Sequence, residues 1–255
     1  LCNACTVLRG GKVTGVCNPK EESNASLSRM MIGSEPPQLE HRPQKPGAAV
    51  MMVKGLSLPR EDQFGVDLED VHLHIRSGEV VGIAGVSGNG QKELLYALSG
   101  EDDRAPRGSV HMGEVDVSHM HPGRRRKMGL HFVPEERLGR GAVPTLSLAH
   151  NLLLTRSEAL GTGGWIRMGA LADQARSIID RFKVKASGPD AAARSLSGGN
   201  LQKFIVGREI SASPKLLIVS QPTWGVDVGA AAQIRAEILA LRDAGCAVLV
   251  VSEEL

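Results

Sequence analysis

The sequence predicts an α/β fold built around a mixed or parallel core sheet. Glu79–Ala84 is an apolar run bounded by glycines, which is typical of a central parallel strand buried on both faces; a glycine-rich loop and a helical pattern follow it directly. Leu216–Val219 and Ala247–Val251 are two further apolar runs, separated by the predicted helix Ala230–Arg242. Because the connections between them are long enough to be crossovers, we expect the three strands to be parallel.

Length and composition limit the classes of protein to consider. At about 150 residues per domain, 255 residues predict one large domain and a smaller unit. The formal net charge is +2 and the chain has seven aromatic residues, which excludes nucleic acid as the expected partner, because such binders use a clustered basic face and stacking rings. No apolar run approaches the length of a membrane-spanning helix.

The first 33 residues read as a small unit followed by a linker. Thr6–Arg9 and Lys12–Val16 flank two glycines and predict a hairpin with a tight turn, and Ser23–Ile32 predicts a short helix. Residues 34–48 are rich in proline and predict an extended linker. The larger unit is therefore expected to span 49–255. Because the chain starts at Leu1 and stops directly after an apolar strand, we expect it to be an excised piece, truncated at its C-terminus.

Three of the four cysteines lie near the start of the chain. Cys2 and Cys5 have the spacing of half a zinc ribbon, but the second pair is missing, and Cys17 completes no metal-ligand pattern. We therefore expect reduced thiols and no metal site.

Two strands open the larger unit, and a glycine-rich loop follows. Val50–Val53 and Val71–Ile75 are predicted strands, the second alternating between apolar residues and histidine. The loop has the frame of a phosphate-binding loop up to its last two positions, where Gln91 replaces the lysine and Lys92 replaces the Ser or Thr that ligates magnesium. Its candidate nucleotide-binding residues are Gly85, Ser87, Gly88, Asn89, Gly90, Gln91, Lys92 and Glu93.

Backbone N–H groups and a helix N-terminus remain in this loop to bind phosphate. A dinucleotide fingerprint is excluded because it requires glycine where Glu93 stands. Two alternatives stay open: the loop is a purely structural turn, or Lys92 substitutes for the missing lysine. Further on, the basic run Arg124–Lys127 is expected to be a solvated helix face rather than a binding site.

The segment Leu196–Lys203 reads LSGGNLQK and resembles the LSGGQ signature of the ABC ATPases, with Asn200 in the final position. Ser197 is a candidate N-cap, and the glycines Gly198 and Gly199 allow a phosphate to approach the start of the helix. We expect Leu201, Phe204 and Ile205 to give this helix a buried face. The structural alternative is a capped helix start that happens to contain glycines.

Downstream segments extend the resemblance. Lys215–Thr223 is similar to the family's Walker B strand, with Ser220 where the family has Asp and Gln221 where it has the catalytic Glu. Asp227 matches the D-loop residue, Glu135 stands at the Q-loop position, and Glu253 lies near the position of the switch histidine. The resemblance therefore implies that no catalytic residue is intact in this domain.

Specific motifs narrow the resemblance to the second nucleotide-binding domain of the tandem ATPases of sugar and nucleoside importers. They are Pro134–Arg137, Ser147–Asn151 and Gln221–Gly229. The resemblance implies a P-loop NTPase-like domain with an N-terminal antiparallel β subdomain and a helical subdomain over about residues 136–200. It also implies that residues 1–33 are the tail of a preceding nucleotide-binding domain.

Members of this family form head-to-tail pairs in which each ATP lies between the phosphate loop of one domain and the signature of the other. The resemblance then implies that this domain supplies Ser197, Gly198, Gly199 and Asn200 to the ATP of the preceding domain, where Mg²⁺ would mainly be bound. The expected partners are that domain, transmembrane permease subunits and, indirectly, an extracytoplasmic solute-binding protein. The expected location is the cytoplasmic face of the membrane, as a peripheral subunit that docks through the segment from Glu135 to Pro189.

Two other functions remain as alternatives. One is a non-hydrolytic interaction module with a vestigial ATP site, and the other is a soluble ABC ATPase outside transport. Because the base and the metal ligands are missing, the chain alone is expected to hydrolyse ATP little or not at all.

Overall fold

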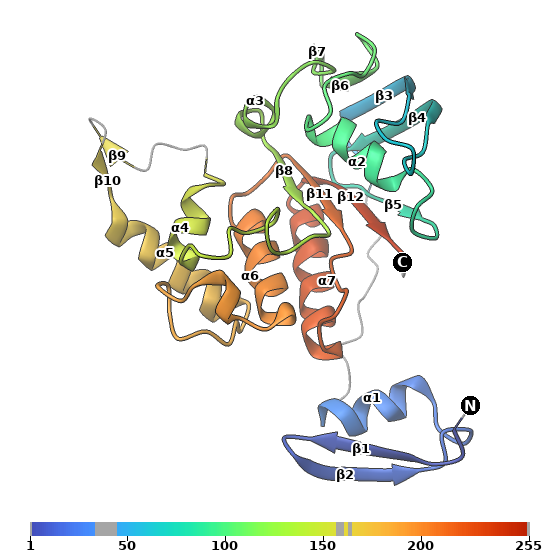
Figure 1. The fold of residues 1–255 in the computed structure, drawn as a ribbon, viewed down its shortest axis with the longest axis vertical. Helices are drawn as coiled ribbons and strands as arrows, with labels where there is room; N and C mark the ends of the chain where they lie inside the picture. The colour runs from blue at the N-terminus through green and yellow to red at the C-terminus, as the bar shows by residue number, and fades with distance from the viewer. Residues whose placement is uncertain (1, 34–44, 157–160, 163–164, 254–255) are drawn as a thin grey trace.

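Four strands form a parallel sheet in the order β5-β12-β11-β8 (Figure 1). They are β5 (Val80–Ala84), β8 (Leu130–Val133), β11 (Leu216–Ser220) and β12 (Ala247–Ser252). The structure is a computed structural model that describes residues 2–33, 45–156, 161–162 and 165–253. All three pairings within the sheet are parallel, which confirms the predicted α/β fold with a parallel core.

The two inner strands have cores on both faces. Leu217 and Val219 of β11 point into a cluster with helices α5 (Met168–Arg181), α6 (Gly198–Ile210) and α7 (Val228–Asp243). The alternate residues Leu216 and Ile218 point into a second cluster, with α2 (Gln91–Ser99) and an antiparallel sheet. Because every residue of β11 and β12 is buried, and a fully buried aliphatic side chain contributes about 1.5–3 kcal/mol, the register of these strands is strongly fixed.

The strand before the glycine-rich loop differs from its prediction. β5 lies at the edge of the described sheet, so the expected central position is wrong; the strand does contact a core on each face, but it is partly rather than fully buried. Its apolar pattern arises because Val80 packs against one cluster while Val81 and Ile83 pack against the other. An apolar run reports contacts above and below a strand, but it carries no information on the neighbours beside it.

An antiparallel sheet covers the second face in the order β4-β3-β6-β7. Its strands are β3 (Ala49–Leu58), β4 (Leu68–Arg76), β6 (Val110–Met112) and β7 (Val115–Asp116). β3 runs well beyond the predicted Val50–Val53, and its register with β4 shifts near Gly55, whose φ of 58° is accessible to glycine at low cost. The predicted half-buried strand Val71–Ile75 lies within β4.

The N-terminal hairpin and helix are confirmed. β1 (Cys5–Arg9) and β2 (Lys12–Cys17) are antiparallel, and the turn glycines Gly10 and Gly11 both have positive φ. α1 (Asn24–Ile32) starts at a capping box between Ser23 and Ser26. The predicted linker falls mostly on residues 34–44, which lie outside the described residues.

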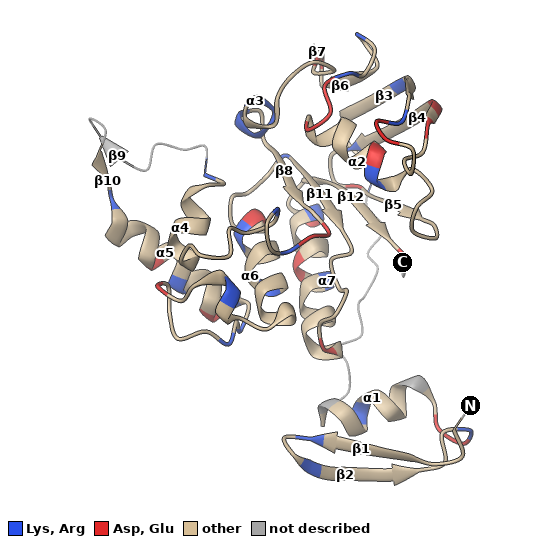
Figure 2. Cartoon of the chain, viewed as in Figure 1, with Lys and Arg blue, Asp and Glu red and all other residues tan. Residues whose placement is uncertain are grey.

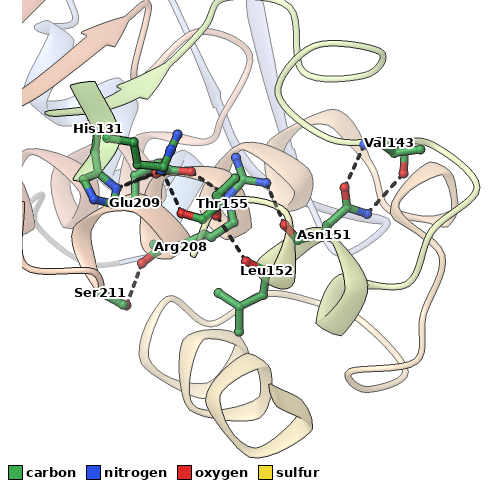
Figure 3. A network of polar contacts seen from close by, with 10 residues as sticks. His131, Val143, Asn151, Leu152, Thr155, Arg208, Glu209 and Ser211 are labelled. Carbon is green, nitrogen blue, oxygen red and sulfur yellow. Dashed lines mark hydrogen bonds and ion pairs between the residues drawn. The ribbon is translucent and has the colours of Figure 1, made fainter. Parts of the chain in front are cut away.

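Residues 136–200 contribute short elements beside α6. They are α4 (Leu148–Leu153), β9 (Gly161–Thr162), β10 (Trp165–Ile166), α5 and a 3₁₀ turn, η1 (Ala193–Ser195). Asn151, which is fully buried, accepts a hydrogen bond from the Val143 N–H and donates to the Val143 carbonyl, fixing the loop before α4 (Figure 3). The motif Ser147–Asn151 therefore has a structural use.

The basic run forms α3 (Pro122–Lys127), which Figure 2 shows as a largely basic segment. The expectation of a solvated face is wrong for two of its members. Arg125 is fully buried and donates to five backbone carbonyls, including Ala97 and Leu98 at the end of α2. These carbonyls need donors because the last turn of a helix leaves them unpaired, and burial lowers the pKa of Arg125 to about 10. Arg126 enters an ion-pair network instead.

That network centres on Glu209 of α6, whose side chain is fully buried (Figure 3). Its carboxylate lies 2.7 Å from Arg126, 2.7 Å from Arg208 and 2.8 Å from the ring of His131 on β8. Arg126 also donates to the Thr155 carbonyl, after α4. Burial alone would raise the pKa of Glu209, but Arg208, His131 and Arg126 outweigh burial and hold that pKa well below its ordinary value.

The substitution Glu209→Gln should destabilise the chain by about 3–5 kcal/mol, because it leaves buried guanidinium groups without their counter-charge. A lowered folded-state pKa contributes stability that is present above the unfolded pKa of about 4.3 and is lost as pH falls below it. Urea unfolding between pH 3 and pH 7 should therefore show a steeper acid loss for wild type than for the variant. Equal acid slopes would contradict the assignment of this loss to Glu209.

Candidate functional site

A pocket of about 360 Å³ lies at the carboxyl ends of β5, β8, β11 and β12. Parallel strands place the loops that follow them along one edge of the sheet, which is where ligands bind in open α/β folds. The predicted residues that line the pocket are Gly85, Ser87, Gly88, Gln91, Lys92, Glu93, Glu135, Ser220, Gln221 and Glu253. The structure thus brings together residues that are up to 168 positions apart in the sequence.

The glycine-rich loop is bridged by the side chain of Gln91. Its Nε2 donates to the Val86 carbonyl at 3.0 Å, and its Oε1 accepts from the Asn89 N–H at 2.9 Å. The Asn89 amide also donates to the Val86 carbonyl. One N–H group that a phosphate-binding loop offers to its ligand is therefore already paired within the loop.

Other loop residues have separate positions. Gly90, with φ of 94°, is buried at the start of α2, which has no side-chain cap there. Lys92 places its ammonium over the ring of Tyr96 at 5.4 Å from the centroid, at the wall of the pocket. Glu93 accepts from the Val66 N–H at 3.2 Å and so ties α2 to the segment before β4. Phe64 is 87% exposed and lies at the pocket rim.

The ends of β11 and β12 meet across this pocket. Gln221 accepts hydrogen bonds at its Oε1 from the Ser252 hydroxyl at 3.2 Å and the Glu253 N–H at 3.4 Å. Its φ of 46° is unusual for a residue other than glycine. Ser220 is buried at the end of its strand and faces the same pocket. Neither residue offers the carboxylate that would hold magnesium through water or accept a proton.

The charges around the pocket are unfavourable for a polyphosphate. Five carboxylates line it, from Asp62, Glu93, Glu135, Glu136 and Glu253. Two cationic side chains, Lys92 and Arg140, stand against them. The N–H groups at the start of α2 can still hold a phosphate, but the five carboxylates oppose its binding, and the described residues contain no group of His, Cys, Asp or Glu side chains placed to hold a metal ion.

The signature and D-loop residues share a second hollow of about 370 Å³. It is lined by Ser197, Gly198, Gly199, Asn200, Gly225 and Asp227, together with Lys185 and Lys203. Ser197 stands at the N-cap of α6, but its side chain caps no backbone N–H; its hydroxyl accepts from the Asn200 amide at 2.8 Å instead. Asp227 caps α7 by accepting from the Ala230 N–H at 2.9 Å. The predicted buried face of Leu201, Phe204 and Ile205 is present.

Sequence reasoning missed three basic residues near this hollow. The Lys185 N–H donates to Asn200 Oδ1 at 2.9 Å, which ties a distant loop to the signature. Lys203 donates to the Lys183 carbonyl at 2.6 Å, and burial lowers its pKa. Arg137 belongs to the motif Pro134–Arg137, but it contacts Gln202 and Trp224, which are distant in the sequence. No local sequence pattern could therefore have predicted its role.

Comparisons with known proteins show which family the sequence resembles. The family model for the ABC transporter matches residues 68–224. The chain is 35% identical to the guanosine import ATP-binding protein NupO of Bacillus subtilis over 259 residues, covering 100% of this chain and 50% of NupO. It is 40% identical to the glucose import ATP-binding protein TsgD13 of Haloferax volcanii over 256 residues, covering 98% of this chain and 46% of that protein. The chain thus spans about half the length of these relatives.

The fold has solved counterparts. The dimeric bacterial ABC transporter cassette MJ0796 superposes with a TM-score of 0.67, at 20% identity, covering 80% of this chain and 88% of that one. This likeness concerns the fold alone.

Isothermal titration calorimetry of this chain should show weak ATP binding, with a Kd well above the micromolar range and little effect of magnesium. The reason is that backbone donors and a helix dipole are the main groups left to hold phosphate. The double variant Gln91→Lys with Lys92→Thr restores the missing phosphate and magnesium ligands of the loop, and should bind more tightly with magnesium than without it. Sub-micromolar, magnesium-dependent binding by the wild type would contradict this description of the pocket.

Proposed function

The chain belongs to the ABC transporter family, and on this basis we propose that it is the second nucleotide-binding half of a subunit that drives import of a sugar or a nucleoside. The curated relatives are import ATP-binding proteins about twice as long as the chain. The chain also has a hairpin and helix ahead of its ABC-type unit, as expected if residues 1–33 end a preceding domain, 34–48 are a linker and 49–255 form the second domain.

The observation that carries the proposal is the contrast between the two hollows. The first lacks the family's lysine and metal ligands, and the Gln91 side chain makes hydrogen bonds to the backbone of its own loop. The second keeps the signature glycines beside Asp227. In this proposal the preceding domain binds Mg-ATP and supplies the base, and this domain completes γ-phosphate recognition with Ser197, Gly198 and Gly199.

The chemistry of the signature fits that role. The Ser197 hydroxyl accepts from Asn200, which leaves its own O–H to donate to a phosphate oxygen. Ser197 is exposed and stands at the N-terminus of the 13-residue helix α6, whose dipole and unpaired N–H groups favour an anion. Binding and hydrolysis of ATP would supply the free energy of transport, and this domain would position the phosphate.

Permease subunits are the proposed membrane partners, with an extracytoplasmic solute-binding protein acting through them. The segment from Glu135 to Pro189 exposes Leu138, Val143 and Leu154, two of which line a hollow of about 250 Å³ next to the Glu209 network. No helix in the described part of the chain is long and apolar enough to cross a membrane. Because the curated relatives are import ATP-binding proteins, we propose attachment at the cytoplasmic face through the permease.

A non-hydrolytic scaffold is the second candidate, favoured by the missing ligands of the first pocket. A scaffold does not need phosphate to reach the start of α6. Substitution of the signature residues should therefore have little effect if the chain is only a scaffold.

The substitution Ser197→Arg, made in the full protein with its permease, should reduce ATP hydrolysis by about 100-fold or more, because a long cationic side chain blocks the approach of phosphate to the helix start. Gln91→Ala should cause a much smaller loss, since Gln91 already lacks the charge that the chemistry uses. ATPase assays in membranes measure both effects.

Thermal melting controls for folding, and the exposed position of Ser197 makes unfolding by Ser197→Arg unexpected. Gly198→Asp is a less clean variant because a Cβ at Gly198 would approach Arg137 Nη1 to 2.7 Å. Similar mild losses from Ser197→Arg and Gln91→Ala would show that this domain acts only as a scaffold.

A further inference from the structure

The guanidinium of Arg137 lies between the signature helix and the loop that follows β11. Its Nε donates to Gln202 Oε1 on α6 at 3.0 Å, and its Nη2 donates to the Trp224 carbonyl. The same group stacks on the Trp224 ring, 5.5 Å from the centroid. One side chain from the segment after β8 thus binds two of the elements that line the second hollow, α6 and the loop after β11.

Two glycines make room for this guanidinium. A Cβ at Gly198 would lie 2.7 Å from Arg137 Nη1, and a Cβ at Gly225 would lie 3.1 Å from Nη2. Gly198 is in the first turn of α6, and Gly225 stands two residues before Asp227. The backbone at the start of α6 and the backbone of the loop after β11 are therefore packed directly against Arg137.

Gln202 extends the contact to the first pocket. Its side chain is almost fully buried, and Nε2 lies 3.4 Å from the Gln221 carbonyl and 3.3 Å from the Pro222 carbonyl. Gln221 in turn faces the first pocket and contacts the end of β12. A continuous set of hydrogen bonds therefore runs from Gln221 through Gln202 to Arg137, and so joins the two hollows.

The partners of Arg137 among the described residues are neutral amide, carbonyl and indole groups, and burial lowers its pKa. These hydrogen bonds and the ring contact fix the position of the guanidinium by their directions and lengths, without an ion pair. A planar guanidinium suits this task because its donors point along fixed directions, whereas an ammonium group is a single point charge.

We propose that Arg137, together with Gln202, is a positioning residue that keeps the signature turn and the Asp227 loop in one fixed relative geometry. Arg137 lines neither hollow; it acts through Ser197–Gly199 on one side and Asp227 on the other. This inference rests on the proposed function, because those residues are taken to complete the ATP site of the preceding domain.

The test uses the full protein with its permease and the variants Arg137→Met, Arg137→Lys and Gln202→Leu. Arg137→Met should lower kcat for ATP about tenfold or more while KM stays within about threefold, because the residue orients other groups without contacting ATP. Arg137→Lys should not restore kcat, since a lysine keeps the charge but cannot bind two elements at once. Arg137→Met and Gln202→Leu combined should lose less than the product of the single effects.

Amide hydrogen exchange on this chain gives a readout that needs no ATP. Arg137→Met should accelerate exchange at the hydrogen-bonded amides of Leu201, Trp224 and Val226, while the surface variant Arg104→Met, whose partner is Asp102, should leave these amides and kcat unchanged. Full activity of Arg137→Met or Arg137→Lys, unchanged exchange, or multiplicative losses would overturn the proposal. If Ser197→Arg retains activity, the proposed function fails, and the exchange result still decides the positioning role.

An independent observation concerns the N-terminal hairpin. Cys5 and Cys17 are directly opposite each other in the antiparallel pairing of β1 and β2, and both are half-buried. Opposed residues of antiparallel strands have Cα atoms about 4.5–5.5 Å apart, within the range of about 4.4–6.8 Å that a disulfide spans. Cys2 is exposed nearby in the sequence, and Cys246 is buried beside β12.

We infer that Cys5 and Cys17 form an oxidisable dithiol whose oxidant is a low-molecular-weight disulfide such as oxidised glutathione. The Cys5 thiolate attacks one sulfur of the oxidant and releases one glutathione thiolate. The Cys17 thiol then attacks the mixed disulfide, loses its proton and releases the second glutathione, which leaves a Cys5–Cys17 disulfide. Burial and the adjacent Cys5 raise the pKa of Cys17, which favours Cys5 as the first nucleophile.

Oxidised glutathione titrated against the native chain, followed by peptide mass mapping, should give a Cys5–Cys17 cross-link with a loss of two hydrogens. Cys17→Ser should instead stop at the mixed disulfide on Cys5, and Cys2→Ser should still form the cross-link. A Cys2–Cys5 disulfide, or glutathione attached to Cys2 alone, would overturn this assignment.

Discussion

The parallel pairing of β11 with β8 on one side and β12 on the other is the constraint on which the rest of the structure depends. Because all residues of β11 and β12 are buried, a shift in register would move their apolar side chains to the wrong layer. The same pairing brings the ends of these strands to one edge. Gln221, Ser252 and Glu135 therefore line the same pocket, although they lie in segments far apart in the sequence. Core packing and the composition of the pocket are therefore consequences of one register.

The sequence predicted elements whose signal is local. The apolar runs of β11 and β12, the glycine that ends α2 and the Gly-Gly turn of the first hairpin each depend on neighbouring residues, and each is present. Most predicted pocket residues also line one hollow, because motif order fixes which strand end each one follows. The roles assigned to these residues stay predictions.

What could not be predicted depends on contacts across the chain. The edge position of β5 reflects its lateral neighbours, and the burial of Arg125 reflects carbonyls at the end of a distant helix. The Asn200 side chain binds Ser197 and the Lys185 backbone, whereas the resemblance to the signature indicated only that Asn200 takes the place of a glutamine. Arg137 likewise binds residues 65 and 87 positions away. Such partners are chosen by the fold, so no window of sequence contains them.

The hydrogen bonds that Gln91 makes inside its own loop have a consequence for the conformational freedom of that loop. Three hydrogen bonds already join Val86, Asn89 and Gln91, so these residues have less conformational entropy to lose when another group binds the loop. This loop therefore offers a preformed surface, and any ordering that accompanies contact has to take place on the group that meets it.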